Sequence, residues 1–199
     1  MKIIDCVQGT PEWHAARCGI PTASNFDKIV DVTGKPSKQR KKYLYQLAGE
    51  RITGKAEETY QNGAMQRGIQ LEAEARNYYE FTCGKTVKEV GFCLVDGKWK
   101  YGASPDGLVD KDGKIEIKCP TIATHVTYLV DGGLPSDYFQ QVQGQLLVTG
   151  REWCDFISYY PGMNPLIVRV EPDKKFLAIL KAELEAFCAE LEEVVAKIK

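Results

Sequence analysis

The sequence predicts a mixed α/β domain in which helices flank a central mixed β-sheet. Short runs that are apolar, or that alternate apolar with polar residues, indicate strands near residues 107–119, 153–160 and 166–170. Longer stretches at 137–149 and 173–198 repeat apolar residues at steps of three and four, which is typical of helices. Because strand-like and helix-like segments alternate along the chain, we expect both types of element to share one core.

Length and composition limit the class of protein. A chain of 199 residues is most simply one domain, 1–199, with the helix at about 173–198 docked on it. The net charge of −1 is unexpected for a protein that coats DNA over its whole surface, so any DNA contact must be local. No apolar run reaches about eighteen residues and no basic-then-apolar leader is visible, so we expect neither a membrane span nor secretion. Seven cysteines without a C-x-x-C pair fit a reducing cytoplasm better than a disulfide framework or a zinc site.

The N-terminal segment predicts a short strand at 1–5 followed by two helix starts. Thr10 precedes a proline and an acid, which favours a helix capped by Thr10 that ends near Gly19. A second helix is expected to open after Thr22, with Ser24 in its first turn, where unpaired N–H groups attract anions.

Trp13 and Arg17 lie one turn apart on the first of these helices. Beside the N-terminus that Thr22 opens, Arg17 could complete a phosphate pocket. The alternative is a tryptophan in the core next to an ordinary surface arginine.

Two features of the next segment allow an ordinary and a functional interpretation. The run 35–42, which begins with Lys35, holds five cations and no acid; it could be a solvated helix face or the lip of a DNA channel. A helix predicted from about 64 to 81 carries Met65 and Glu72. Met65 could be a core residue or a wedge at the end of a duplex, and Glu72 an ordinary surface acid or a member of a metal centre.

Residues 91–95 and 99–103 read as strands that lead into a hairpin. The hairpin strands are Leu108-Val109 and Lys114 to Cys119, joined at Lys111-Asp112-Gly113. We expect Gly113 to adopt the left-handed last position of a three-residue loop, with Asp110 opposite Lys114.

This register brings two carboxylates and an ammonium to one face of the hairpin. Asp106 is expected to face Lys118, with Glu116 diagonal to Asp106, while Ile115 and Ile117 point into a core. Crowded carboxylates repel one another unless a hard cation such as Mg²⁺ lies between them, and a metal-held water beside a lysine can attack a phosphodiester. A plain surface hairpin is the competing interpretation, because acid-x-Lys tripeptides recur elsewhere in the chain.

The C-terminal half predicts helices at 124–130 and 137–149, strands at 153–160 and 166–170, and a last helix at 173–198. In the second helix, Phe139, Val142 and Leu146 occupy a buried face, and Tyr138, Gln141 and Gln145 lie on another face, free for a polar role. The apolar stripe of the last helix is most simply docked on the domain, with a subunit contact as the alternative.

A family resemblance rests on several of these blocks in order. P-D-G-L followed by E-I-K-C-P within 104–120 resembles the core of the PD-(D/E)xK nucleases. The flanks are similar to the lambda-type phage exonucleases, the YqaJ-like viral recombinases, over about three quarters of the chain. The matching blocks are Trp13-x-x-x-Arg17-x-Gly19-x-x-Thr22-Ala23-Ser24, Gly68-x-x-x-Glu72 and Tyr138-x-x-Gln141-Val142-Gln143.

The resemblance implies a restriction-endonuclease-like fold and roles for some of the matching residues. Asp106 and Glu116 would hold Mg²⁺ with the Ile117 carbonyl, and two ions are possible, with Mn²⁺ as a substitute. Lys118 would position or activate the water with help from Gln141. Three further residues have implied roles: Glu72 would support a second metal or the water, and Arg17 and Ser24 would hold a 5′ phosphate.

The resemblance also implies an activity and partners. These are 5′→3′ digestion of one strand of double-stranded DNA by a homotrimer ring, giving 3′ tails to a phage-type single-strand annealing protein in the host cytoplasm. The residues themselves indicate only metal-dependent phosphodiester cleavage. A site- or structure-specific endonuclease with the same metal site, and a non-catalytic DNA-binding domain, remain alternatives.

Overall fold

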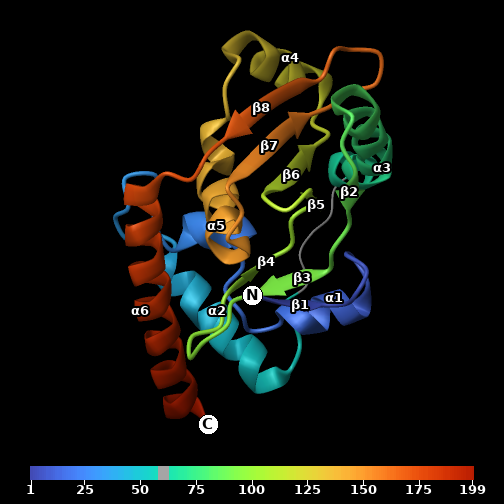
Figure 1. Cartoon of the computed structure of the whole chain (residues 1–199). Helices are drawn as coiled ribbons and strands as arrows, with labels where there is room; N and C mark the ends of the chain where they lie inside the picture. Colours follow the sequence, from blue (N-terminus) through green and yellow to red (C-terminus); the bar gives the residue numbers. More distant parts are fainter. Residues whose placement is uncertain (58–62) are drawn as a thin grey trace.

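The computed structural model describes residues 1–57 and 63–199, except the side chains of 63–65 and 69. It confirms the predicted mixed α/β class (Figure 1). The main sheet has five strands in the order β2-β5-β6-β7-β8, in which β6 and β7 run parallel and the other neighbours run antiparallel. Its strands are β2 (Val87–Lys88), β5 (Gly107–Val109), β6 (Gly113–Lys118), β7 (Trp153–Ser158) and β8 (Leu166–Val170).

A second, three-stranded antiparallel sheet stands beside the first, in the order β1-β3-β4. Its strands are β1 (Lys2–Ile4), β3 (Phe92–Leu94) and β4 (Gly102–Ala103). The expectation of one central sheet was therefore incomplete. The change of sheet comes at Ser104-Pro105, between β4 and β5, where proline has no N–H to donate to a ladder.

The helices lie close to their predicted positions. They are α1 (Pro11–Arg17), α2 (Arg40–Thr53), α3 (Gly63–Cys83), α4 (Ile122–Asp131), α5 (Phe139–Thr149) and α6 (Lys174–Ile198), with 3-10 turns η1 (Ala23–Lys28) and η2 (Ser136–Tyr138). Thr10 caps α1 as predicted, since its hydroxyl accepts from the Trp13 N–H at 3.4 Å. The segment after Thr22 is a 3-10 helix in place of an α-helix, and Thr22 makes no side-chain cap there.

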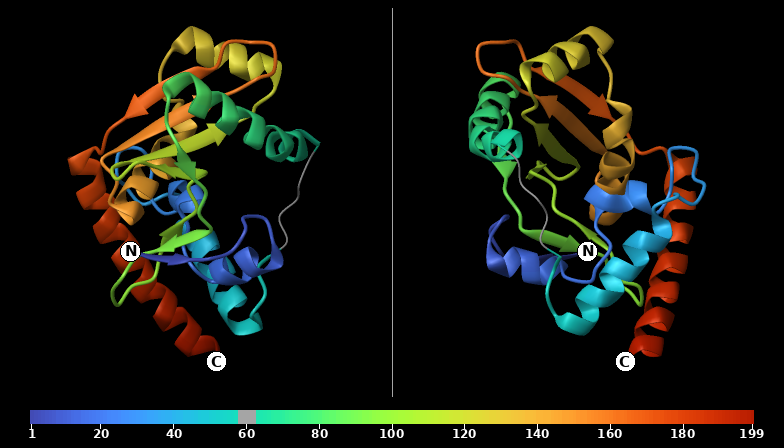
Figure 2. Two further views of the ribbon diagram at one scale, coloured as in Figure 1. Left: turned by 45° about the vertical axis from the view of Figure 1, so that its right-hand side comes forward. Right: turned by 180° about the vertical axis from the view of Figure 1, so that it is seen from behind.

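Helices cover both faces of the main sheet (Figure 2). On one face, Ile115 and Ile117 of β6 pack with Ala75 and Tyr79 of α3. On the other, Val142 and Leu146 of α5 pack with Cys154 and Phe156 of β7. The central strand β6 is thus buried on both sides, so Lys114 and Glu116 lie inside the protein and Lys118 at the strand's end stays partly open to solvent.

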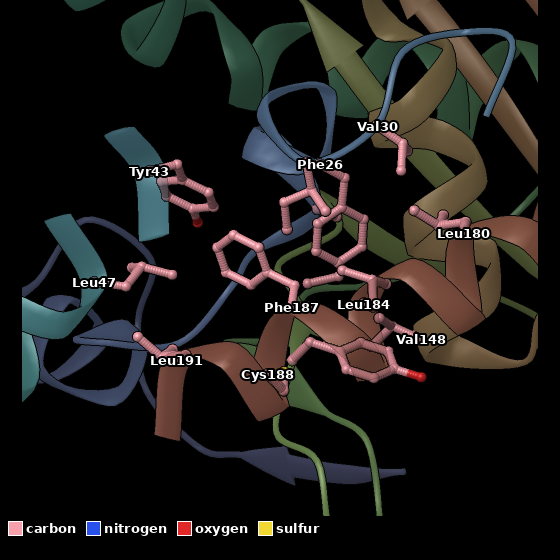
Figure 3. Packing of buried hydrophobic residues seen from close by; sticks show 14 of the residues in the cluster. Phe26, Val30, Tyr43, Leu47, Val148, Leu180, Leu184, Phe187, Cys188 and Leu191 are labelled. Carbon is pink, nitrogen blue, oxygen red and sulfur yellow. The ribbon is translucent and has the colours of Figure 1, made fainter. Parts of the chain in front are cut away.

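The largest apolar cluster joins α6 to α2 and η1 (Figure 3). Leu180, Leu184, Phe187 and Leu191 of α6 are at most 1% exposed and form its centre. Truncating one such leucine to alanine typically costs about 2–5 kcal/mol. The packing of α6 on α2 therefore accounts for the helical stripe seen in the sequence.

The register of the β5–β6 hairpin differs from the prediction by two residues. Gly107 pairs with Ile115 and Val109 with Gly113, so the ladder extended by one residue places Asp106 opposite Glu116. The loop is accordingly 110–112, and Asp110 adopts the left-handed conformation at φ 48°.

Gly113 is needed for a different reason from the one predicted. A Cβ at Gly113 would collide with the indole of Trp153 on β7, so a close approach between strands requires glycine at this position. Asp110 also does not face Lys114; its carboxylate pairs with Lys85 at 2.5 Å.

Candidate active site

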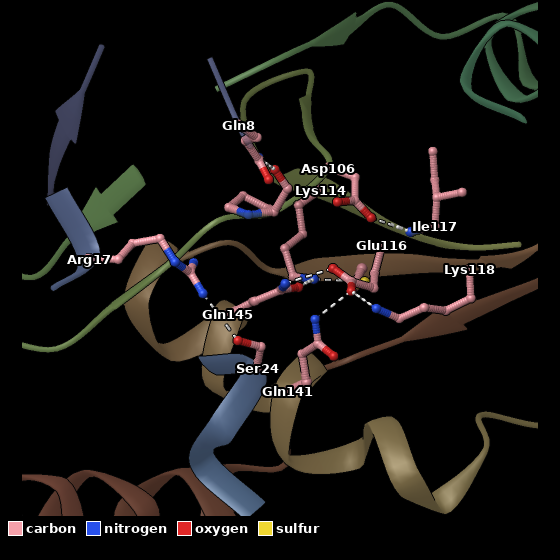
Figure 4. A network of polar contacts seen from close by, with 12 residues as sticks. Gln8, Arg17, Ser24, Asp106, Lys114, Glu116, Ile117, Lys118, Gln141 and Gln145 are labelled. Atoms are coloured by element: carbon pink, nitrogen blue, oxygen red, sulfur yellow. Dashed lines mark hydrogen bonds and ion pairs between the residues drawn. The ribbon is translucent and has the colours of Figure 1, made fainter. Parts of the chain in front are cut away.

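Glu116 is the centre of a buried polar network on the face of β6 that α5 covers (Figure 4). Its side chain is 1% exposed, and both carboxylate oxygens accept hydrogen bonds. Oε1 lies 2.7 Å from Lys118 Nζ and accepts from Gln141 Nε2 at 2.5 Å. Oε2 accepts from Gln145 Nε2 at 2.6 Å. The two glutamines are one turn apart on α5, so this helix sets the orientation of the carboxylate.

Asp106 reaches the same place from the end of the loop before β5. Its Oδ2 accepts from the backbone N–H of Ile117 at 2.6 Å, which fixes it beside Glu116. Burial raises the pKa of Asp106 well above its ordinary value, and the charges of Glu116 and Glu72 raise it further. A cation between these carboxylates would relieve that repulsion.

Lys118 remains an ammonium in this environment. Burial lowers its pKa, but the adjacent Glu116 and Asp106 carboxylates outweigh burial and raise the pKa overall. The Nζ also lies 5.0 Å from the ring centroid of Tyr138, a cation–π contact at the start of α5. Lys118 can therefore supply fixed positive charge where negative charge develops.

Glu72 lies near this cluster but turns toward a neighbour on its own helix. Its carboxylate pairs with Arg76 at 2.7 Å, and Arg76 also reaches Glu89 at 3.1 Å. Burial raises the pKa of Glu72, and the charge of Glu116 contributes in the same direction. Glu72 and Asp106 line one open groove of about 890 Å³. Gln8, Trp13 and Gly91 also line it.

Arg17 is held in a pocket of hydroxyl groups. Its guanidinium stacks 4.0 Å from the Trp13 ring centroid. It donates to Ser104 Oγ at 3.1 Å, Ser24 Oγ at 3.3 Å and Thr22 Oγ1 at 3.4 Å. Burial lowers the pKa of Arg17 to about 10.

The pocket around Arg17 lacks a matching negative charge. Among the residues that the structure describes, no carboxylate lies within ion-pair distance of the guanidinium. A half-buried arginine surrounded by neutral hydroxyls is suited to an anion from outside the chain. Ser104 links this pocket to the cluster around Glu116, because it lies two residues before Asp106.

Comparison with known proteins identifies the family. Residues 12–152 match the model of the YqaJ-like viral recombinase domain. This chain belongs to that family. The matched segment contains Arg17, Glu72, Asp106, Glu116 and Lys118.

Solved structures of similar proteins agree with this membership. An alkaline exonuclease, LHK-Exo, from Laribacter hongkongensis is 39% identical, covers 95% of this chain and 96% of its own, and superposes with a TM-score of 0.87. The same enzyme in complex with dAMP gives 39% identity, 96% coverage of both chains and a TM-score of 0.86. A phage-related exonuclease from Haemophilus somnus 129PT, at 15% identity, 90% and 96% coverage and a TM-score of 0.68, shares the fold. The comparison with curated protein sequences found no match.

Two residues proposed as DNA contacts are not brought to the cluster around Glu116 by any contact that the structure describes. Lys35 is exposed in the loop before α2, where its backbone N–H donates to Asp31 at 3.0 Å and the preceding Gly34 packs on Ile179 of α6. Met65 belongs to the first turns of α3, and its side chain lies outside the described residues. Their proposed roles therefore remain predictions.

Three polar residues of this candidate site were not among the predicted site residues. Ser104 directly precedes the P-D-G block, Gln145 follows Gln141 by one helical turn, and Lys114 precedes Glu116 by two residues on the same strand face. In each case the spacing from a predicted site residue was visible in the sequence. Gln145 was placed on the polar face of its helix, but its contact with Glu116 depends on how α5 crosses the sheet.

The chemistry of the donor set suits Mg²⁺. Within residues 1–57 and 63–199, no group of three or more His, Cys, Asp or Glu side chains is arranged so that it could hold a metal ion by itself. Mg²⁺ in phosphoryl-transfer sites is usually held by one or two carboxylates, with waters and substrate phosphate completing the shell. Asp106 and Glu116 provide two hard oxygen donors, and a cation bound between them would offset the acidic charges that, after burial, raise the pKa of Asp106.

Proposed function

We propose that this YqaJ-family protein is a Mg²⁺-dependent exonuclease that hydrolyses the phosphodiesters of double-stranded DNA from the 5′ end. One observation carries the proposal. Two carboxylates and an ammonium, Asp106, Glu116 and Lys118, converge beside a groove that also reaches the helix bearing Arg17. Acid, acid and lysine are all present, which favours catalysis over DNA binding alone.

In this proposal Asp106 and Glu116, with the Ile117 carbonyl, hold Mg²⁺, and Glu72 supports a second ion or the water. Bound metal supplies a Lewis acid and lowers the pKa of a coordinated water. Lys118 places a fixed positive charge beside the phosphate that gains negative charge as the nucleophile attacks. Gln141 holds Glu116 in place through the 2.5 Å hydrogen bond. Mn²⁺ prefers similar oxygen ligands and is expected to substitute.

Recognition of the 5′ end is proposed to rest on Arg17 and Ser24, with Ser104 in the same pocket. A guanidinium can donate two parallel hydrogen bonds to a phosphate, and the hydroxyls of Ser24 and Ser104 already surround its donors. The related alkaline exonuclease has been crystallised with dAMP, a nucleoside monophosphate. A product of that kind is what an exonuclease would release from a DNA end.

The proposal extends to assembly and partners. We expect a homotrimer ring around the duplex, and a phage-type single-strand annealing protein that receives the 3′ tail. Exposed apolar residues Ile122, Val126 and Val130 form a stripe along α4 that is available for contact with another subunit.

All seven cysteines are free, which agrees with a reducing cytoplasm such as that of a bacterial host. Within the part of the chain that is described, no helix is both long and apolar enough to span a bilayer.

The test is digestion of a linear duplex labelled at the 5′ end. The proposal predicts early release of labelled mononucleotide in Mg²⁺ and none in the presence of a chelator. Release of label from the 3′ end first would contradict the assigned direction. Internal cleavage of the same duplex to defined fragments would favour an endonuclease.

A further inference from the structure

Lys114 is a buried cation that the proposed chemistry does not use. It is 0% exposed and lies two residues before Glu116 on the same face of β6. Its Nζ donates to the side-chain oxygen of Gln145 and to Cys154 Sγ, the latter at 2.9 Å. In the described part of the chain no carboxylate lies within ion-pair distance of it. Burying an ammonium costs several kcal/mol unless hydrogen bonds and nearby charge offset the loss of water.

The contact with Lys114 determines which way the Gln145 amide faces. A lysine ammonium has donors only, so the Gln145 oxygen must face Nζ and the amide nitrogen must face away from it. That nitrogen donates to Glu116 Oε2 at 2.6 Å. The reversed amide would place N–H groups against an ammonium and a carbonyl oxygen against a carboxylate, so both contacts would become repulsive. Lys114 thereby ensures that Gln145 presents its N–H donor to Glu116 Oε2.

The two oxygens of Glu116 therefore lie in different surroundings. Oε2 is held on the closed side by Gln145, which is 1% exposed. Oε1 is shared by Lys118 and Gln141, which are both partly open to solvent. The side of Oε1 is therefore the more open of the two, and it is the side on which Lys118 lies.

We infer that Lys114 and Gln145 are positioning residues that hold Glu116 by its buried oxygen, so that its other oxygen is presented to the metal and to Lys118. The inference rests on the proposed nuclease function and deepens it. Residues that orient a metal ligand in this way typically change metal affinity or activity about 10- to 100-fold when they are mutated. Neither residue touches substrate, so each acts through Glu116.

The chain offers a matched control on the same helix. Gln143 is also a glutamine of α5 at 1% exposure, and both ends of its amide are bonded, to the Glu171 carbonyl at 2.9 Å and to the Asp173 N–H at 2.8 Å. It makes no described contact with Glu116. Gln145→Met and Gln143→Met therefore both replace a buried, bonded amide with an apolar chain of similar length. Only Gln145→Met removes the donor to Glu116.

The first experiment measures Mg²⁺ affinity by calorimetry without DNA, together with the maximal rate of DNA cleavage, for these two variants and the wild type. For Gln145→Met we expect about 10-fold weaker Mg²⁺ binding or about 10-fold slower cleavage at saturating Mg²⁺. For Gln143→Met we expect both quantities to stay within about 2-fold of wild type, even if its melting temperature falls as far as that of Gln145→Met. Equal effects of the two variants would overturn the inference and leave only a structural role.

The second experiment asks whether Lys114 acts through Gln145. Lys114→Met should slow cleavage in the wild-type background and should have little further effect in the Gln145→Met background. If the double variant lost the product of the two single-variant reductions in rate, Lys114 would not work through this amide. If Lys114→Met does not fold, the comparison of Gln145→Met with Gln143→Met decides the matter. A wild-type protein that neither binds Mg²⁺ nor cleaves DNA would refute the proposed function itself, whereas normal wild-type behaviour with unaffected Gln145→Met would refute only this inference.

Discussion

The carboxylate of Asp106 accepts a hydrogen bond of 2.6 Å from the backbone N–H of Ile117. This bond ties the segment before β5 to the middle of β6, so the backbone itself holds Asp106 next to Glu116. The cost of this arrangement is that burial, together with the charges of Glu116 and Glu72, raises the pKa of Asp106.

The first prediction separates the charge of Asp106 from its structural role. Asp106→Asn keeps an oxygen that can accept from Ile117 but removes one negative charge from the cluster. We expect cleavage to be abolished and the fold to be retained. Without metal, the variant should melt no lower than wild type, because repulsion with Glu116 and Glu72 is relieved. Mg²⁺ should raise the melting temperature of wild type through binding to the folded state, and that of Asp106→Asn far less.

The control for this prediction is Asp137→Asn, which removes a charge from η2, outside the carboxylate cluster. Glu116→Ala should also abolish cleavage, although loss of a buried acceptor for Gln141 and Gln145 is expected to destabilise the fold. Strong cleavage by both Asp106→Asn and Glu116→Ala at saturating Mg²⁺ would refute the assigned metal ligands.

The second prediction concerns Lys118. Lys118→Met should slow cleavage on the order of 10²-fold or more, because a preorganised charge beside the reacting phosphate is lost. Both proposed metal ligands remain, so calorimetry should give a Mg²⁺ affinity close to that of wild type. If excess Mg²⁺ restored the full rate, Lys118 would serve the metal site and not the transition state.

The third prediction tests recognition of the 5′ end. Wild type should digest a duplex with a 5′ phosphate faster than one with a 5′ hydroxyl, since the donors around Arg17 lack a carboxylate partner of their own. Arg17→Ala should be slow on both substrates and should show a smaller ratio of the two rates. The control is Arg151→Ala, which removes a guanidinium bonded to the Asp110 carbonyl at 2.9 Å on the hairpin loop. An Arg17→Ala enzyme that kept the wild-type ratio would exclude Arg17 from the phosphate site.

The fourth prediction concerns two helical glycines with different surroundings. A Cβ at Gly144 of α5 would collide with the Phe26 ring, whereas a Cβ at Gly49 of α2 would meet nothing within 4 Å. Gly144→Ala should therefore destabilise the protein by about 1–3 kcal/mol. Gly49→Ala should stabilise it by about 0.5–1 kcal/mol, because alanine favours a helix. Urea unfolding measures both, and a Gly144→Ala variant as stable as Gly49→Ala would show that α5 does not pack tightly on η1.

The sequence was sufficient for the parts of the fold that depend on local pattern. The cap at Thr10, the strand Leu166–Val170 and the helix at 173–198 follow from short-range rules, and the structure has them within a residue or two. The hairpin register was wrong because Gly113 was interpreted as a turn residue. Its actual constraint is the Trp153 ring on β7, a strand forty residues later in the chain that no local rule connects to it.

The candidate site was predicted in part for the same reason. Asp106, Glu116 and Lys118 do meet in the structure, as their residue types and spacing had indicated. Gln141, which the family resemblance had added, joins them through its hydrogen bond to Glu116. Gln145 and Lys114 were missed as members, because their roles depend on the crossing of α5 over β6. A lysine on a strand usually indicates a solvated face, and only burial of both faces of β6 places Lys114 inside the protein.

The most direct measurement compares a linear duplex with the same DNA as a covalently closed circle, at equal concentration in Mg²⁺. An exonuclease that begins at a 5′ end should convert the linear duplex to mononucleotides and 3′-tailed strands, and should leave the circle intact. Asp106→Asn in parallel excludes a contaminating nuclease. Cleavage of the closed circle by wild type, absent with Asp106→Asn, would contradict the requirement for an end and show that the same residues serve an endonuclease.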